Sequence, residues 1–130
     1  MSTEILEIGK QPLEATVVRY PGSNCDWDTL KFFNTNGHHA EFLWHKDIYM
    51  PEADLLVLCG GFAFGDREYD KATGLYLMNP GVQALKSPVH KTIERWVGEG
   101  RPTLGICNGF QILVHAGMLP GRLEQNDIKK

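Results

Sequence analysis

The chain has 130 residues, 42% of them hydrophobic and 22% charged, a composition typical of one globular domain that excludes a disordered or fibrous protein. A net charge of -3 and the absence of any Lys/Arg cluster argue against a nucleic-acid partner. No stretch approaches the roughly 20 apolar residues of a membrane span, and the start "MSTEILEIGKQ" does not look like a secretory signal.

The first half of the chain alternates strand and helix patterns. After an N-terminal extension over residues 1–12, "ATVVRY" at residues 15–20 predicts a strand, and "PGSN" turns the chain into a helix over residues 26–36 that stops at Gly37. Residues 39–44, "HAEFLW", alternate like a second strand. The apolar run in "ADLLVLCGG" predicts a third strand, of the parallel kind that is covered on both faces.

The second half adds a helix, a strand and a final helix. Ser87 and Pro88 are typical of a helix start, and the apolar positions that follow lie on one face of a helix closed by Gly98 and Gly100. Residues 103–106 predict a short buried strand, and the apolar spacing of "GFQILVHAGM" predicts a helix after it. This order predicts an open, mostly parallel, doubly wound α/β sheet, in which ligands lie at the carboxyl ends of the strands.

Cys107 lies where the last strand meets the last helix. In "LGICNGF" this junction forces a sharp, strained turn, which lifts a nucleophile out of the sheet, and Gly105 and Gly109 leave room for it. Free N–H groups at the helix start stabilise a thiolate there. The spacing therefore favours a nucleophile elbow at Cys107, although an inert core cysteine fits the same short pattern.

The loop that follows Cys59 carries a second constellation, "CGGFAFGD". Gly60 and Gly61 can turn N–H groups outward, and such groups beside a nucleophile make an oxyanion hole, with Asn108 offering the other donor. The alternative is that the two glycines only end a strand. The catalytic interpretation requires both features to open onto one crevice, as alternate strands of a parallel sheet would allow.

The three cysteines are Cys25, Cys59 and Cys107. Their odd number and the lack of a C-x-x-C pair argue against a disulfide framework and against a zinc site, so we expect no metal. A reducing, cytoplasmic location fits best.

Four ordered motifs resemble one known family. "YPGSNCDWD", "GGFAFGD", "LGICNGFQIL" and "GMLPGRL" are similar to the glutaminase subunits of phosphoribosylformylglycinamidine synthases, which are class I glutamine amidotransferases of purine biosynthesis. The resemblance extends from Ala15 to Leu123. It implies a flavodoxin-like fold and attack of a thiol on the side-chain amide of glutamine, giving a γ-glutamyl thioester and ammonia.

The resemblance also implies site residues. It makes Cys107 the catalytic nucleophile, and it assigns the oxyanion hole to Gly61 and Asn108 and contacts to glutamine to Gly60, Phe62 and Gln111. Cys25 falls in the family's "SNCD" turn and has no catalytic role there. We expect Cys25 to be a packed thiol near a helix N-cap set by Asn24.

Partners and cofactors follow from the same resemblance. Ammonia would pass to a synthetase subunit that uses ATP and Mg²⁺, with a small accessory subunit as a further candidate partner. The glutaminase subunit itself needs no cofactor, and neither nucleic acid nor a membrane is expected as a partner.

The family's catalytic histidine and glutamate come from a later, H-P-E type motif, which this sequence lacks. His115, about two turns past Cys107, fits a surface or core residue better than a general base. A nucleophile without a base and its orienting acid is an incomplete site. We therefore expect a single amidotransferase-like domain over residues 1–130 whose C-terminal part is missing, and which is inactive alone.

Two other classes of function remain open. A cysteine-elbow redox or hydrolytic protein of the flavodoxin-like superfamily would share the strand order and the G-x-C-x-G turn. A non-catalytic binding module could hold a phosphate or flavin at the "PGSN" turn. Shifts in melting temperature with glutamine and with flavin mononucleotide would separate the three.

Overall fold

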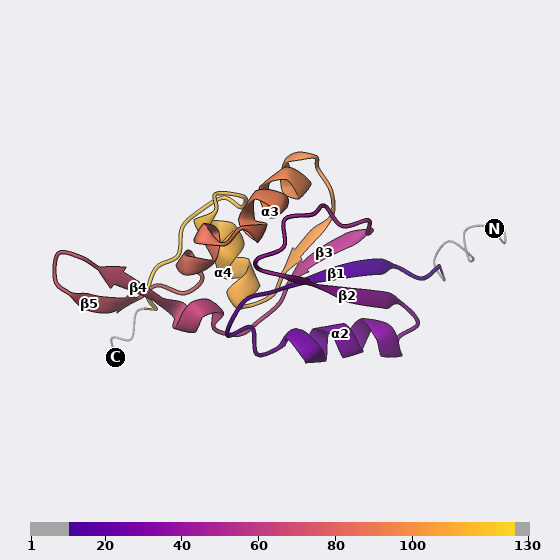
Figure 1. Ribbon diagram of the computed structural model, residues 1–130, viewed down its shortest axis with the longest axis horizontal. Coiled ribbons are helices and arrows are strands. Elements are labelled where there is room, and N and C mark those ends of the chain that lie inside the picture. Colours follow the sequence, from indigo (N-terminus) through magenta and orange to yellow (C-terminus); the bar gives the residue numbers. More distant parts are fainter. Residues whose placement is uncertain (1–10, 127–130) are drawn as a thin grey trace.

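A four-stranded parallel sheet with helices on both faces forms the body of the protein, whose computed structural model describes residues 11–126 (Figure 1). The elements in chain order are β1 (Glu14–Arg19), α2 (Asp26–Thr35), β2 (His39–Trp44), β3 (Leu55–Leu58), the 3-10 helix η1 (Ala63–Asp66), β4 (Arg67–Asp70), β5 (Leu75–Met78), the 3-10 helix η2 (Val82–Lys86), α3 (Val89–Gly98), β6 (Thr103–Gly105) and α4 (Asn108–His115). Their order confirms the doubly wound α/β layout expected from the sequence.

The strands lie in the order β2-β1-β3-β6, and every pair is parallel. Val17 of β1 lies opposite Val57 of β3, which in turn lies opposite Leu104 of β6. The carboxyl ends of β1, β3 and β6 therefore meet at one edge of the sheet. The loops that leave these three strands are neighbours in space.

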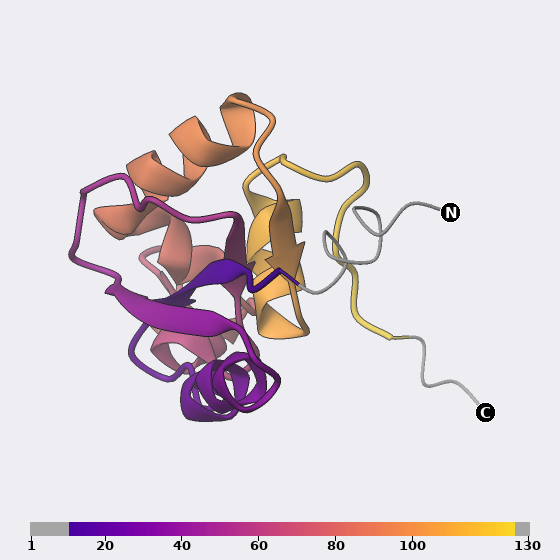
Figure 2. The same ribbon diagram turned by 90° about the vertical axis from the view of Figure 1, so that its right-hand side faces the viewer.

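Two apolar cores form because successive side chains of a strand point to opposite faces. Val18, Leu56 and Leu58 pack with residues of α3 and α4, including the fully buried Trp96. Their neighbours in the sequence instead join Phe33 of α2 on the other face. Figure 2 shows α2 on one side of the sheet and α3 and α4 on the other.

The last strand differs from its prediction in burial. Residues 103–106 read as a buried strand, but Leu104 and Ile106 are each 43% exposed. Among the described residues β6 pairs only with β3, which makes it an edge strand. The sequence pattern showed an apolar run but could not show that one side of it has no neighbouring strand.

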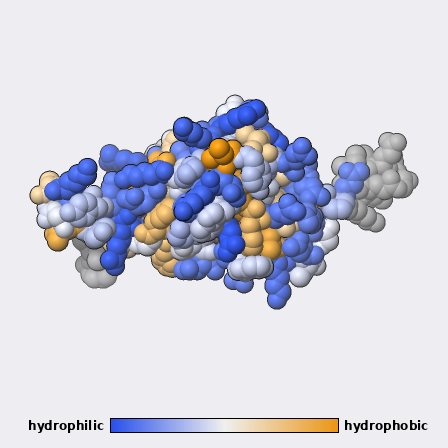
Figure 3. All heavy atoms as spheres, in the orientation of Figure 1, coloured by the Kyte–Doolittle hydropathy of each residue, from blue (hydrophilic) through white to orange (hydrophobic). Residues whose placement is uncertain are grey.

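A β-hairpin was missed by the sequence analysis, which treated the segment after Cys59 as a loop. Strands β4 and β5 pair antiparallel, with Tyr69 opposite Tyr76, and the turn between them closes at Gly74 with φ 73°. The hairpin extends away from the sheet at the left of Figure 1, and some apolar surface shows at that end of Figure 3 among largely polar side chains. Both of its strands carry exposed apolar residues, so they lack the alternation that marks a half-buried strand.

The N-terminal extension predicted over residues 1–12 lies almost entirely outside the described residues. Within residues 11–126, no helix has the length and hydropathy needed to cross a membrane.

Candidate active site

Cys107 occupies a strained turn between β6 and α4. Its backbone has φ 54° and ψ -111°, and residues other than glycine rarely adopt a positive φ. The turn is held by a hydrogen bond from the N–H of Gly109 to the carbonyl of Ile106 (2.8 Å) and by one from Gln111 to the carbonyl of Cys107 (3.1 Å). The side chain of Cys107 is exposed, as a reactive thiol needs to be.

The two glycines that flank Cys107 let α4 pack directly on the sheet. A Cβ at Gly109 would lie 2.8 Å from Cβ of Leu58 in β3, and one at Gly105 would lie 2.6 Å from Cδ1 of Leu113. Neither distance is tolerable between real atoms. The glycines therefore make room for the helix, and this close packing fixes where Cys107 projects.

The loop after β3 lies beside Cys107. A Cβ built on Gly60 would lie 3.5 Å from Cβ of Cys107, and Gly61 has φ 140°, a conformation that favours glycine. The expectation that alternate strands would bring the two loops together was wrong in this detail, because β3 and β6 are immediate neighbours. Neighbouring strands bring their loops closer than alternate strands could.

The turn after β1 fixes the shape of this loop through main-chain hydrogen bonds. The N–H of Phe62 donates to the carbonyl of Gly22 (2.7 Å), and the N–H of Cys25 donates to the carbonyl of Gly60 (3.2 Å). A Cβ at Gly61 would lie 2.6 Å from the Gly22 oxygen. The "PGSN" and "GGFAF" segments thus interlock, and each needs its glycines for that contact.

Two main-chain N–H groups beside the turn have no hydrogen-bond acceptor among residues 11–126. Within residues 11–126, neither the N–H of Gly61 nor that of Asn108 donates to another backbone group. Both follow the carboxyl ends of adjacent strands, β3 and β6. The side chain of Phe62, predicted to contact glutamine, is 58% exposed next to them.

Asn108 has a second role that the sequence did not reveal. Its side chain is 1% exposed; Oδ1 accepts from the N–H of Ala63 (3.1 Å), and Nδ2 donates to Asp66 (2.9 Å) and to Oε1 of Gln111 (3.2 Å). Burial raises the pKa of Asp66, while hydrogen bonds from Asn108 and from the backbone of Gly81 oppose that rise. Asn108 therefore ties the elbow to η1.

Asp66 is the functional candidate that sequence reasoning missed. Asp66 is the last residue of the motif "GGFAFGD", so the motif pointed to its neighbourhood. No sequence pattern indicates that its carboxylate is buried. Asp66 and Phe64 have φ values of 57° and 56°, and with Cys107 they are the non-glycine residues of positive φ within residues 11–126. Strain of this kind gathers at functional sites.

The other two cysteines have different environments. Cys59 is buried, its thiol donates to the carbonyl of Val18 (3.6 Å), and burial, helped by the charge of Asp26, raises its pKa to about 11. Cys25 is exposed, which corrects the expectation of a packed thiol. Asn24 is not the N-cap of α2 either, because Cys25 holds that position and makes no side-chain cap.

Among residues 11–126, no side chain hydrogen bonds to Sγ of Cys107 as a base poised to take its proton would. His115 ends α4, and a rise of about 1.5 Å per residue places it about 12 Å along the helix from Cys107. Its Nε2 atom is buried without a partner. His45 contacts Ser87 at 3.2 Å and packs against Phe64.

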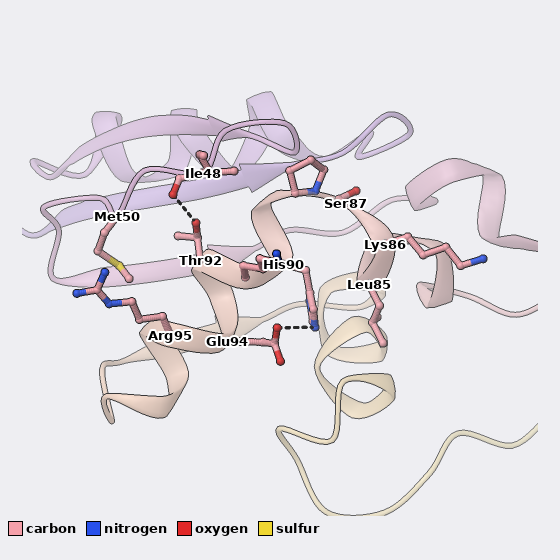
Figure 4. Close-up of a pocket in the computed structure, with 11 residues that line it drawn as sticks. Ile48, Met50, Leu85, Lys86, Ser87, His90, Thr92, Glu94 and Arg95 are labelled. Carbon is pink, nitrogen blue, oxygen red and sulfur yellow. Dashed lines mark hydrogen bonds and ion pairs between the residues drawn. The ribbon is translucent and has the colours of Figure 1, made fainter.

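A cleft of about 670 Å³ lies elsewhere, between α3 and the loop after β2 (Figure 4). Ile48 and Met50 line one wall of this cleft, and Thr92 of α3 lies on the opposite wall. The hydroxyl of Thr92 donates a hydrogen bond to the carbonyl of Ile48 (3.0 Å), which joins the two walls. None of the six predicted site residues lines it. Position at the carboxyl ends of the strands, and not cavity volume, identifies the candidate site.

Comparison with known proteins identifies relatives of one family. Residues 13–130 match the family described as the CobB/CobQ-like glutamine amidotransferase domain. The chain is 40% identical over 116 residues to phosphoribosylformylglycinamidine synthase subunit PurQ of Sulfurimonas denitrificans (88% of this chain, 47% of that protein). It is 42% identical over 110 residues to the subunit of the same name from Thermus thermophilus (85% and 44%).

A solved structure agrees with these sequences. The structure of PurLQS from Thermotoga maritima contains a chain that matches with a TM-score of 0.75 and 34% identity, over 89% of this chain and 50% of that one. The chain thus spans about half the length of the curated relatives it matches. The parallel sheet, the cysteine elbow and these matches lead to one conclusion: the chain belongs to the CobB/CobQ-like glutamine amidotransferase domain family.

Proposed function

We propose that this chain supplies the nucleophile, the oxyanion hole and part of the glutamine pocket of a glutamine amidotransferase. The observation that carries the proposal is the exposed, strained Cys107 between β6 and α4, with free N–H groups at Gly61 and Asn108 beside it. The inert-cysteine alternative does not explain why strain, exposure and free donors coincide.

In the proposed reaction the thiolate of Cys107 attacks the side-chain amide carbon of glutamine. The carbonyl oxygen becomes an oxyanion and takes hydrogen bonds from the N–H groups of Gly61 and Asn108, an interaction worth about 2.7–4 kcal/mol per donor in other enzymes. The C–N bond breaks, the nitrogen takes up a proton and leaves as ammonia, and water then hydrolyses the γ-glutamyl thioester to glutamate. Proton transfer needs a base from outside residues 11–126.

Two neighbours would hold the substrate. The amide of Gln111, one turn past Cys107, accepts a hydrogen bond from Nδ2 of Asn108 that orients it. Phe62 offers an exposed apolar face above the two glycines of the loop. These contacts suit a small polar substrate with a short aliphatic stem.

The relatives' names support a more specific proposal. They are subunits of phosphoribosylformylglycinamidine synthase, and the solved neighbour is named as a complex, PurLQS. We therefore propose that the ammonia is used by a synthetase subunit in purine biosynthesis, and that ATP and Mg²⁺ belong to that subunit. A cytoplasmic location is part of the same proposal.

Covalent labelling tests the glutamine site. A diazoketone analogue of glutamine should add once, at Cys107, and excess glutamine should slow the addition. Cys107→Ser should abolish labelling, whereas Cys59→Ser, which removes a buried thiol, should not. Labelling that glutamine does not slow would remove the glutamine pocket from the proposal.

An assembly assay tests the wider role. The synthetase subunit from the same source should retain this chain on a column. With a general base supplied from outside residues 11–126, the retained complex should make its product from glutamine. Cys107→Ser should abolish this activity but leave the reaction with free ammonia unchanged. Equal loss with glutamine and with ammonia would contradict the role assigned to Cys107.

A further inference from the structure

Two exposed cysteines lie on either side of Gly60. The Cβ that a side chain at Gly60 would carry lies 3.5 Å from Cβ of Cys107 and 3.6 Å from Sγ of Cys25. Both cysteines are exposed. They come from loops after β1 and β6, which lie on either side of β3 in the sheet.

Residue 60 lies between these two cysteines and, as a glycine, puts no side chain there. The backbone of Gly60 has no positive φ and would accept a side chain, so its conformation alone does not require glycine. A methyl group there would contact both cysteines. The hydrogen bond from the N–H of Cys25 to the carbonyl of Gly60 (3.2 Å) holds the first thiol beside this gap.

The third thiol cannot take part. Cys59 precedes Gly60 but is 3% exposed, faces the core beside α2, and donates to the carbonyl of Val18. With its pKa raised to about 11, it is almost wholly protonated at neutral pH. Cys25 and Cys107 are therefore the accessible pair.

We propose that Cys25 and Cys107 form a reversible intramolecular disulfide when the protein meets hydrogen peroxide. The Cys107 thiolate attacks one peroxide oxygen, the O–O bond breaks, and Cys107 becomes a sulfenic acid with release of one water. The Cys25 thiolate then attacks the sulfur of Cys107, the S–O bond breaks and a second water leaves. Two thiols are oxidised and one peroxide is reduced to two waters.

Closing the bond brings two surface loops together. A disulfide needs an S–S distance of about 2.05 Å and Cα atoms within about 7 Å, so both side chains must rotate toward each other over Gly60. Gly22, Asn24 and Cys25 are exposed, so any adjustment of their turn leaves the two cores intact. The bond would cap Cys107 and, if the proposed function holds, reversibly stop attack on glutamine.

Peptide mapping of the 130-residue chain tests the proposal. After treatment with hydrogen peroxide and blocking of free thiols, tryptic cleavage at Lys31 and Arg67 separates the three cysteines. We expect one linked pair, Cys25 with Cys107, whose rate of formation does not depend on protein concentration and which dithiothreitol removes.

Three variants sharpen the test. Cys25→Ser should leave Cys107 without a resolving thiol, so that it proceeds to the sulfinic acid. Cys59→Ser is the matched control and should form the bond at the unchanged rate. Gly60→Ala, which places a methyl in contact with Cβ of Cys107 and Sγ of Cys25, should slow formation of the bond at least tenfold while keeping the melting temperature within a few degrees.

Several results would overturn the proposal. Sulfinic acid at Cys107 with Cys25 still reduced in the unaltered chain would show that the thiols do not meet. Only intermolecular pairs would show the same. An unchanged rate in Gly60→Ala would show that the bond does not form over Gly60, as proposed. None of these readouts uses glutamine, so failure here is separate from failure of the proposed function.

Discussion

At Cys107 the chain accepts a backbone conformation that costs about 1–3 kcal/mol, and glycines on either side give the helix the contacts that maintain it. The motif around this residue was predictable, because strand, cysteine and helix follow in a short stretch with glycines at fixed places. The role of Asp66 was not, because it depends on a positive φ and on a contact with Asn108, 42 residues away. Local pattern carries no information on such contacts.

Gln111 should contribute to glutamine binding and not to the reactivity of the thiol. In a labelling experiment, Gln111→Ala should raise the glutamine concentration that half-protects Cys107 from alkylation. One hydrogen bond is worth about 0.5–1.5 kcal/mol, which corresponds to about two- to tenfold. The rate of alkylation without glutamine should stay within about twofold, and unchanged protection would take Gln111 out of the site.

His45 should make stability depend on pH. Burial lowers its pKa, Lys46 acts in the same direction, and Asp47 opposes both. As pH falls through about 6.5, the unfolded chain binds a proton before the folded one, so the free energy of unfolding should decrease. Urea midpoints between pH 8 and pH 5 would measure this slope, and His45→Gln should flatten it; parallel slopes would show that His45 is not responsible.

Among the elements, the parallel strands were the easiest to predict, because the run in β3 is apolar throughout and is covered on both faces. The structure places β2 at the predicted residues 39–44 and ends α2 at Thr35, one residue before the prediction. The hairpin could not be predicted, because its strands pack on no core and its exposed tyrosines pair only with each other. A strand can be predicted from its apolar pattern when neighbouring elements bury at least one of its faces.

The contact between α4 and β3 should depend on Gly109. Gly109→Ala forces a methyl against Leu58 and should destabilise the chain by about 1–3 kcal/mol, the usual cost of overpacking. Gly98→Ala in α3 is the matched control, because open space surrounds that glycine and alanine favours a helix by up to about 1 kcal/mol. Thermal unfolding followed by circular dichroism measures both variants. Equal melting temperatures for Gly109→Ala and Gly98→Ala would mean that α4 can move away from β3 without loss of stability.

Considered whole, the molecule is a sheet with one side of its last strand uncovered among the described residues. Leu104 of β6 and Ile106, just after the strand, are half exposed, and beside them Phe32 of α2 is 61% exposed. Together with Phe33, Asp28 and Thr29, these side chains line a shallow apolar groove of about 330 Å³. An edge strand with an apolar surface tends to pair with another chain.

We therefore expect the 130-residue chain to self-associate through β6. Light scattering should show an apparent mass that rises with concentration, and Leu104→Lys should reduce it, because a charge on an edge strand opposes pairing. Leu75→Lys, at an exposed leucine of the hairpin, is the matched control and should not. If only the hairpin variant dissolves the assembly, the hairpin and not β6 is the contact surface.

Cysteine reactivity tests most directly whether the β6–α4 turn makes a nucleophile. The reduced chain is treated briefly with limiting iodoacetamide at neutral pH, and the three cysteine peptides are quantified by mass spectrometry. Cys107 should be labelled first, because it alone combines an exposed, strained turn with a helix N-terminus, while Cys25 follows and buried Cys59 is last. Labelling of Cys25 ahead of Cys107, or at the same rate, would contradict the elbow and the function built on it.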